Sequence, residues 1–245
     1  MKILVSVITY NEEASIEGTL NDLIAHNFGY DIVVVDNGSN DNTYTICERL
    51  GVPVIRHCVN TGGSVGTLIS YFTLAYAMKY DILCQFDSDG QHIAAELPKI
   101  IEPIRNGEAD CMIGSRFLTM EGFQSTMVRR LGIRLFSRLF TWTTGCRLTD
   151  ITSGFRAYNR DVIVFFGHTY RDPIYDSMNQ FLLTAFFAGF RIRETPVLMR
   201  SRVAGLSEFT PLKSIVFPIK GVMTFLACIL QRRRIAAMRS ATIKS

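Results

Sequence analysis

The sequence predicts an α/β fold in which a mostly parallel β-sheet is covered by helices on both faces. Three observations support this prediction. Short runs rich in Ile and Val alternate with helix-length stretches through residues 2–114, turn-forming residues bound the runs, and 245 residues with 48% hydrophobic content can fill a large core. Ligands of such open sheets bind beyond the carboxyl ends of the strands, so the residues that follow each apolar run are the first candidates for a site.

The elements of the first half follow one another regularly. Strands are expected at residues 2–8, 32–35, 52–56, 82–86 and 109–114, and helices at 15–25, 42–50, 64–79 and 94–105. The second half is less regular. Residues 129–140 interleave arginines with apolar residues, which is typical of an amphipathic helix with a cationic face. We expect an irregular segment at 148–158, an apolar helix at 181–188 and a final strand at 191–199.

The charge distribution divides the chain into two parts. The net charge of +4 is too small to indicate a nucleic-acid partner. Residues 211–245 contain seven basic residues and no acidic one, whereas residues 1–210 contain 19 basic and 22 acidic residues. The sequence therefore predicts an enzyme-sized domain at 1–210 and a basic amphipathic tail at 211–245.

The cysteines and the apolar stretches indicate a cytoplasmic location. The six cysteines show no metal-ligand spacing, and a chain of 245 residues needs no disulfides, so reduced thiols are expected. The apolar run at residues 1–8 is too short for a signal peptide. The longest apolar stretch, 215–230, is interrupted by Pro218, Lys220 and Gly221, whereas a membrane span needs about 20 apolar residues.

Polar residues follow the expected strands at one edge of the sheet. They are Thr9, Asn11 and Glu12 after the first strand, Asp36 after the second, and Asp87, Ser88 and Asp89 after the fourth. Asp87 and Asp89 are two residues apart, so both carboxylates lie on one side of an extended segment and can reach one hard divalent cation. Such a cation would neutralise a diphosphate. Alternatively, Asp36 and Asp89 are turn formers, because Asp-Asn-Gly and Asp-Gly are turn signals.

Two neighbouring segments extend this candidate site. Gln91 and His92 follow the acidic pair and could add an amide oxygen or a ring nitrogen to a cation. Residues 60–66 are rich in glycine and could cradle an anion at a helix start. This segment lacks the dinucleotide-binding spacing and the lysine of a P-loop, so a turn or a helix-packing role is an equal alternative.

Seven ordered motifs together resemble family 2 glycosyltransferases of the GT-A fold, in particular the polyprenyl-phosphate branch that includes dolichol-phosphate mannose synthase. The resemblance covers about residues 2–207. The motifs are residues 9–12, 35–39, Asn60 with Gly62 and Gly63, 87–92, 114–117, 150–156, and Arg202 with Gly205 and Ser207.

The resemblance implies transfer of a sugar from a nucleotide-diphosphate sugar to a polyprenyl phosphate, with Mg²⁺ or Mn²⁺ as cofactor. It assigns cation binding to Asp87, Asp89 and Gln91. It assigns nucleotide-sugar binding to Thr9, Asn11, Glu12, Asp36, Gly38, Asn60, Gly63, Asp87 and Ser88. The catalytic candidates are Asp89, Arg116, Arg202 and Asp176, and the acceptor-phosphate candidates are Arg130, Arg134 and Ser207.

Two departures from the family pattern bear on the acceptor. Gln180 stands where relatives usually carry an acidic residue, and Leu206 stands where they often carry a basic one. A sugar hydroxyl needs a general base, whereas a lipid phosphate is already anionic, so the loss of the acid favours phosphate. The alternatives are a glycosyltransferase that extends a lipid-linked glycan with Asp176 as base, and a non-catalytic nucleotide-sugar-binding partner of a membrane glycan assembly.

The tail is expected to form an amphipathic helix on the inner face of the cell membrane. Its apolar residues recur at spacings of three and four, and Arg232, Arg233 and Arg234 follow them. An apolar stripe with flanking cations is typical of a helix that lies in the surface of an anionic bilayer. The alternative is that this helix packs on the body or on a partner, either a second copy of the chain or a small membrane protein.

Overall fold

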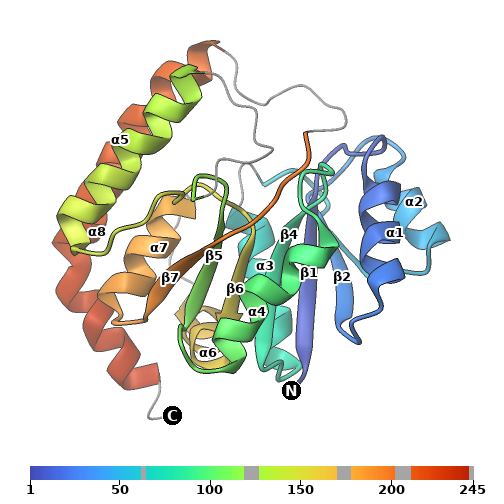
Figure 1. Cartoon of the computed structure of the whole chain (residues 1–245), viewed down its shortest axis with the longest axis horizontal. Helices are drawn as coiled ribbons and strands as arrows, with labels where there is room; N and C mark the ends of the chain where they lie inside the picture. The colour runs from blue at the N-terminus through green and yellow to red at the C-terminus, as the bar shows by residue number, and fades with distance from the viewer. Residues whose placement is uncertain (62–64, 119–126, 170–177, 202–210, 243–245) are drawn as a thin grey trace.

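The computed structural model describes residues 1–61, 65–118, 127–169, 178–201 and 211–242 (Figure 1). Within these residues a seven-stranded sheet has the order β3-β2-β1-β4-β6-β5-β7. The strands are β1 (Ile3–Thr9), β2 (Asp31–Asp36), β3 (Val54–Arg56), β4 (Ile82–Asp87), β5 (Cys111–Ser115), β6 (Arg156–Asn159) and β7 (Ile192–Pro196). Neighbouring strands pair in parallel except β6, which is antiparallel to both β4 and β5. The predicted fold class is confirmed.

Helices cover both faces of the sheet because the strands are apolar on both sides. Along β1, Ile3, Val5 and Val7 pack with α1 (Ile16–His26), α2 (Thr43–Arg49) and α4 (Leu97–Arg105), and a short 3₁₀ turn, η1 (Ala94–Glu96), precedes α4. Leu4 faces the other way. On its side lie α3 (Val65–Ala77), α5 (Met127–Thr144), α6 (Arg160–Thr169), α7 (Met178–Phe187) and α8 (Pro211–Thr242).

The structure differs from the expected elements in one region of the sheet. Residues 148–158 were expected to be irregular, but β6 begins at Arg156 and α6 follows it directly. A strand of four residues is too short to show a hydrophobic period, and its first residue is a fully buried arginine. Arg156 is accommodated because its guanidinium donates to the backbone carbonyls of Ile151 and Ser153, each at 2.7 Å.

The tail helix α8 covers most of the predicted tail and uses two of its faces. It continues to Thr242, twelve residues beyond the apolar stretch 215–230. Phe225, Cys228 and Ile235 are buried in the core that α8 shares with α6 and α7. A second face carries exposed apolar side chains, namely Val222, Met223, Leu226 and Leu230. One face therefore packs on the body and the other has no cover within the described residues.

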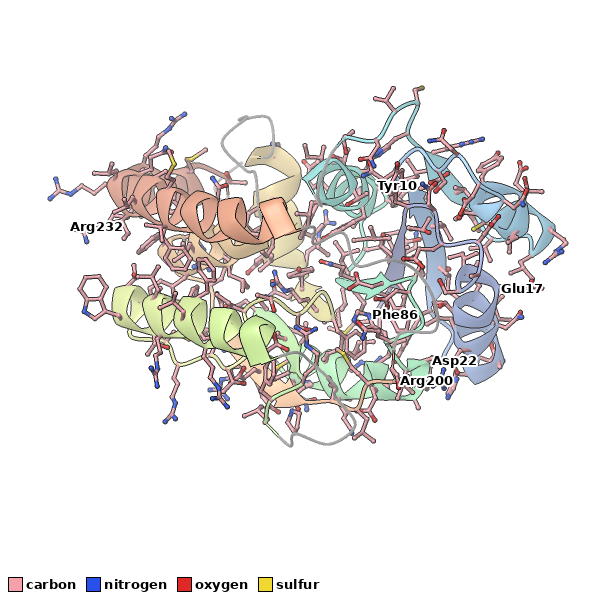
Figure 2. The ribbon with its side chains drawn as sticks, turned by 90° about the horizontal axis from the view of Figure 1, so that it is seen from above. Tyr10, Glu17, Asp22, Phe86, Arg200 and Arg232 are labelled. Carbon is pink, nitrogen blue, oxygen red and sulfur yellow. The ribbon has the colours of Figure 1, made fainter. Side chains whose placement is uncertain are left out.

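Helices α5 and α8 lie side by side at the end of the molecule opposite α1 and α2 (Figures 1 and 2). The rings of Phe136 on α5 and Phe225 on α8 lie 6.3 Å apart. Arg232 projects away from the body at the outer part of α8 (Figure 2). Among the described residues, no helix is both long enough and apolar enough to span a bilayer.

Candidate functional site

The polar residues predicted at the strand ends meet at the carboxyl edge of the sheet. β1, β2 and β4 are adjacent, and their register places Thr9 opposite Asp36 and Ile8 opposite Asp87. Because the three strands are parallel, their last residues share one edge. The first requirement of the predicted site, that these residues converge, is therefore met.

Asp36 and Thr9 present buried polar atoms that have no hydrogen-bond partner among the described residues. Asp36 Oδ1 accepts hydrogen bonds from the amide and the hydroxyl of Ser39, at 2.9 and 2.6 Å. Asp36 Oδ2 and Thr9 Oγ1 accept none, although Arg56 Nε lies 3.5 Å from that Asp36 oxygen. Buried polar atoms are costly to leave unsatisfied, so this pair is suited to a polar ligand.

Asn11 and Glu12 connect the loop after β1 to the loop after β2. The amide of Asn11 donates to Ser39 Oγ at 2.9 Å, and the amide of Glu12 donates to Thr43 Oγ1 at 2.8 Å. Asn11 adopts a positive φ of 52°, which asparagine tolerates better than most residues. Through these hydrogen bonds, Asn11 and Glu12 fix the positions of the two loops relative to each other.

Gly38 and Asn60 bring a third loop over the end of β2. Gly38 has a φ of 81°, and a Cβ there would lie only 2.7 Å from the carbonyl carbon of Val59. The side chain of Asn37 ties this loop down, because its Nδ2 donates to Asn60 Oδ1 at 3.1 Å and its Oδ1 accepts from the Thr61 hydroxyl at 2.8 Å. Gly38 is thus required by the close approach of two backbones, which places Asn60 beside the site.

Residues 87–92 form a compact turn that carries the three predicted cation ligands, Asp87, Asp89 and Gln91. The amide of Ser88 continues the pairing with β1, donating to the Ile8 carbonyl at 3.2 Å, and the Ser88 side chain is buried. Gly90 has a φ of 78°, and the Gln91 amide donates to Asp89 Oδ1 at 3.0 Å. The Asp87 side chain is 41% exposed, so its carboxylate reaches the mouth of the site.

The side chains of this turn fit a hard divalent cation. Asp87, Asp89 and Gln91 offer carboxylate and amide oxygens, which Mg²⁺ and Mn²⁺ prefer. Within the described part of the chain, no group of three or more His, Cys, Asp or Glu side chains could hold a metal by itself. The donor set is therefore incomplete without oxygens from a substrate or water, as is usual for Mg²⁺ bound together with phosphates.

Gly154 provides the floor beneath the Asp87 carboxylate. A Cβ at this position would lie 2.8 Å from Asp87 Oδ1 and 2.9 Å from Cγ, and it would also collide with Oδ2. Any larger residue at position 154 would force the Asp87 carboxylate to move. The sequence motif at 150–156 contained this glycine, but nothing in the sequence indicated what lies against it.

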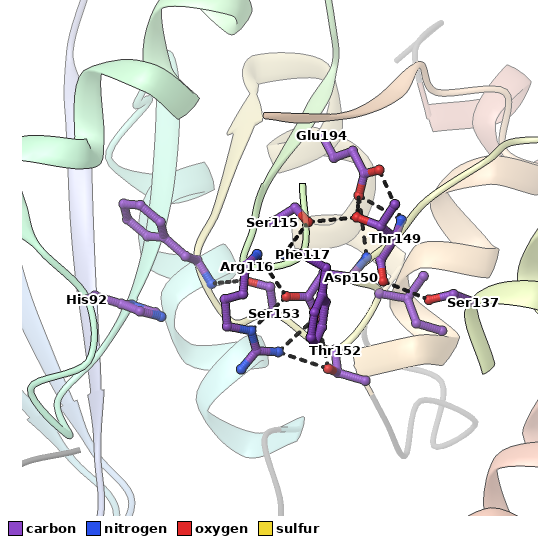
Figure 3. Close-up of polar contacts among 12 residues, drawn as sticks. His92, Ser115, Arg116, Phe117, Ser137, Thr149, Asp150, Thr152, Ser153 and Glu194 are labelled. Carbon is purple, nitrogen blue, oxygen red and sulfur yellow. Dashed lines mark hydrogen bonds and ion pairs between the residues drawn. The ribbon is translucent and has the colours of Figure 1, made fainter. Parts of the chain in front are cut away.

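Arg116, at the end of β5, forms a buried ion pair in the site (Figure 3). Its Nε donates to Asp150 Oδ2 at 2.7 Å and its Nη2 to Asp150 Oδ1 at 2.9 Å, with a further bond to the Thr152 hydroxyl at 3.0 Å. Burial opposes the positive charge, but the bonds to Asp150 outweigh burial and raise the pKa of Arg116. Asp87 and Asp89 contribute in the same direction, which places the guanidinium within their electrostatic reach.

Glu194 on β7 holds the segment that carries Asp150, and sequence analysis did not identify it. Glu194 Oε2 accepts from the amide and the hydroxyl of Thr149, at 2.8 and 3.0 Å, and Ser115 Oγ lies 2.7 Å from the same hydroxyl (Figure 3). Burial raises the pKa of Glu194 above its ordinary value. No clear signal for this role is present in the sequence, because Glu194 stands between Arg193 and Thr195 in a short strand of mixed character.

Several residues of the predicted site, including most of those expected to bind the acceptor, lie outside the residues that the structure describes. Gly63, Asp176, Arg202 and Ser207 lie outside the described residues, and so does the side chain of Arg130. Arg134 is described and is exposed on α5. Gln180, which stands where an acid was expected, is buried in α7.

Comparisons with known proteins place the chain among glycosyltransferases. Residues 4–165 match the family model described as Glycosyl transferase family 2. The chain is 30% identical over 213 residues to UDP-N-acetylglucosamine–dolichyl-phosphate N-acetylglucosaminyltransferase of Methanococcus voltae, covering 80% of this chain and 84% of that one. It is 33% identical over 172 residues to undecaprenyl-phosphate mannosyltransferase of Micrococcus luteus, covering 66% and 68%.

A solved structure shows the same fold. Glucosyl-3-phosphoglycerate synthase of Mycobacterium tuberculosis, in complex with Mn²⁺, UDP-glucose and phosphoglyceric acid, superposes with a TM-score of 0.69 over 93% of this chain and 79% of that one. The sequence identity is 20%. At this identity the likeness concerns the GT-A fold alone.

Proposed function

The chain belongs to glycosyltransferase family 2, and we propose that it transfers a sugar from a nucleotide-diphosphate sugar to a polyprenyl phosphate, with Mg²⁺ or Mn²⁺ as cofactor. The observation that carries the proposal is the acidic turn 87–91 at the end of the buried strand β4, beside the orphaned buried atoms of Thr9 and Asp36. The named acceptors of relatives that cover 66–80% of this chain are dolichyl and undecaprenyl phosphate.

The described residues provide a donor site with two functions. Thr9 Oγ1 and Asp36 Oδ2, which are buried without a hydrogen-bond partner among the described residues, would bind polar groups of the base and ribose. Asp87, Asp89 and Gln91 would hold the cation, which when bound supplies Lewis-acid stabilisation of the departing diphosphate. Arg116 adds a positive charge near this position, and Asp150 fixes its orientation.

A phosphate acceptor is compatible with the residues at the position of the missing base. Gln180 is buried and carries no acidic group, so it cannot accept a proton from a hydroxyl. A phosphate monoester is already anionic at pH 7 and needs positive charge and orientation more than deprotonation. Arg134 and Arg138, which are exposed on α5, are available to supply such charge.

We also propose that the enzyme is peripheral on the cytoplasmic face of the membrane, bound through α5 and α8. Trp142 on α5 and Leu230 on α8 are 83% and 85% exposed. The side chains of Arg232, Arg233 and Arg234 are exposed on the same pair of helices. Apolar side chains next to cations favour an anionic bilayer surface, and six free thiols suit a reducing compartment.

The function is tested by measuring transfer from radiolabelled nucleotide sugars in the presence of Mn²⁺. Polyprenyl phosphate, the matching polyprenol and a lipid-linked glycan are offered as alternative acceptors. We expect product only with the phosphate, and no product in excess chelator. Transfer to the glycan, with a loss of about 100-fold or more in Asp176→Asn, would instead identify a hydroxyl acceptor activated by a general base.

The membrane contact is tested with a matched pair of methionines. Met223 on α8 is 65% exposed and Met78, at the end of α3, is 52% exposed. Met223→Glu removes apolar surface from the proposed contact and adds a negative charge, so sedimentation with anionic liposomes should weaken about tenfold or more. Met78→Glu should leave it unchanged. Equal behaviour of the two variants would place the contact elsewhere.

A further inference from the structure

His92 closes the turn 87–92 by holding Asp87 at two points. Its Nδ1 accepts a hydrogen bond from the backbone amide of Asp87 at 2.9 Å, and its Nε2 lies 3.6 Å from Asp87 Oδ2. Because Nδ1 is an acceptor, the proton of the neutral ring is on Nε2 and faces the carboxylate. One side chain thus contacts both the backbone and the functional group of Asp87.

The register of the sheet explains why the Asp87 amide needs a side-chain partner. Alternate amides of a strand point to opposite neighbours, and Ser88 donates to Ile8 on β1, so the Asp87 amide points toward β6. The pairing of β4 with β6 ends at Gln85 and Arg156, two residues earlier. The imidazole therefore supplies the acceptor that the sheet no longer provides.

The surrounding rings fix the orientation of the imidazole. His92 is buried, its ring meets Phe86 edge-on at 5.0 Å, and it lies 4.8 Å from the ring of Phe155. Phe155 directly follows Gly154, the floor of the Asp87 carboxylate. In this packed position Nδ1 is engaged by the Asp87 amide and Nε2 faces the Asp87 carboxylate, so both ring nitrogens are directed at Asp87.

We propose that His92 is the positioning residue of the cation site, which holds the Asp87 carboxylate in its binding orientation without being a ligand. This inference rests on the metal dependence proposed above. Partners that orient metal ligands typically account for 10- to 100-fold in metal affinity. His92 accepts a hydrogen bond from the Asp87 backbone and contacts the Asp87 carboxylate, so it restricts the orientations that this carboxylate can adopt.

The test compares three variants of the full chain by their affinity for Mn²⁺ in the presence of UDP. His92→Phe keeps the ring volume against Phe86 and Phe155 but removes both nitrogens. His92→Asn keeps an acceptor near the position of Nδ1. His26→Phe, at the exposed end of α1, is the control for the same substitution elsewhere.

We expect the dissociation constant for Mn²⁺ to rise about tenfold or more in His92→Phe and to recover in part in His92→Asn. UDP binding in chelator should stay within about twofold in all variants, which separates a positioning role from general damage. The electron spin echo spectrum of Mn²⁺ bound to the wild-type protein should show no directly coordinated imidazole nitrogen.

Three results would overturn the inference, and a fourth would overturn its premise. Positioning by hydrogen bonds would be excluded if His92→Phe bound Mn²⁺ with native affinity, or if His92→Phe and His92→Asn lost affinity equally. It would also be excluded if the wild-type spectrum showed a directly coordinated nitrogen. If His92→Phe does not fold, His92→Asn decides: a positioning acceptor predicts a dissociation constant for Mn²⁺ that rises by less than about tenfold, and a larger loss would overturn the inference. Absence of Mn²⁺ binding by the wild-type protein would refute the cation site itself.

Discussion

Replacing Gly154 by alanine tests whether the position of the Asp87 carboxylate governs activity. The added Cβ would lie 2.8 Å from Asp87 Oδ1, whereas ordinary contacts begin at 3.4 Å. The carboxylate must therefore move by roughly 0.5–1 Å, since the Gly154 backbone is held between β6 and the Asp150 segment. Gly154 does not adopt a positive φ, so alanine introduces no backbone strain of that kind.

The expected effects on stability and on activity differ in size. The atoms that must move belong to the end of a side chain that is 41% exposed, so the free energy of unfolding should change by about 1 kcal/mol or less. A displacement of about 1 Å in a catalytic arrangement can cost 100-fold. We therefore expect kcat/KM to fall about 10- to 100-fold and the Mn²⁺ concentration for half-maximal rate to rise, with the thermal midpoint nearly unchanged.

Gly18→Ala is the matched control. Gly18 lies on the exposed side of α1, and a Cβ there meets nothing within 4 Å. This variant should keep full activity and gain about 0.5–1 kcal/mol in free energy of unfolding, or about 1–4 °C in thermal midpoint. The assay is sugar transfer at several Mn²⁺ concentrations, with calorimetry of both variants. If Gly154→Ala showed wild-type Mn²⁺ dependence and rate, the argument that this glycine reserves the place of the carboxylate would be refuted.

Three further predictions concern neighbouring parts of the site. Asp89→Asn should abolish transfer while leaving the thermal midpoint almost unchanged, because it removes charge at nearly constant volume; substantial activity of the wild-type enzyme in chelator would contradict this. Asp150→Ala should cost about 3–5 kcal/mol in urea unfolding, because it leaves the buried Arg116 without its carboxylate partner, and a loss below about 1 kcal/mol would show the pair to be unimportant. The metal-free protein should lose up to about 3 kcal/mol as the pH falls from 6.5 toward 4, because the pKa of His92 is lowered from 6.5 to about 4 by burial and the unfolded chain binds the proton first. This pH dependence, followed by thermal unfolding, should be weaker in His92→Phe.

The convergence of the donor-site residues was predictable from the sequence, because it depends on local pattern and a general rule. Buried parallel strands give continuous apolar runs, and the residue after each run necessarily lies at the carboxyl edge. Thr9, Asp36 and Asp87 could therefore be placed at one edge before their strands were paired. The order of the strands was not needed for this step.

The supports of these residues could not be predicted, because they depend on contacts between distant segments. Asp150 is 34 residues from Arg116, and Glu194 reaches Thr149 across 45 residues. β6 escaped recognition because four residues that begin with a buried arginine have no apolar period. The different roles of the two faces of α8 could not be predicted either. The spacing of apolar residues indicates a helix, but it does not show which of its faces packs on α7.

The distribution of charge explains why a cation is required on the donor side of the proposed reaction. A nucleotide diphosphate and a polyprenyl phosphate are both anionic, so the enzyme must offset two separate groups of negative charge before they can meet. On the donor side the charge of Arg116 is largely compensated by Asp150, and Asp87 and Asp89 are themselves negative. A divalent cation held by those carboxylates would supply the positive charge that a diphosphate needs there. For the acceptor phosphate, we expect the positive charge to come from arginines such as Arg134 and Arg138, which are exposed on α5. Chelation should therefore weaken donor binding as well as transfer, whereas charge reversal on α5 should raise the KM for the acceptor alone.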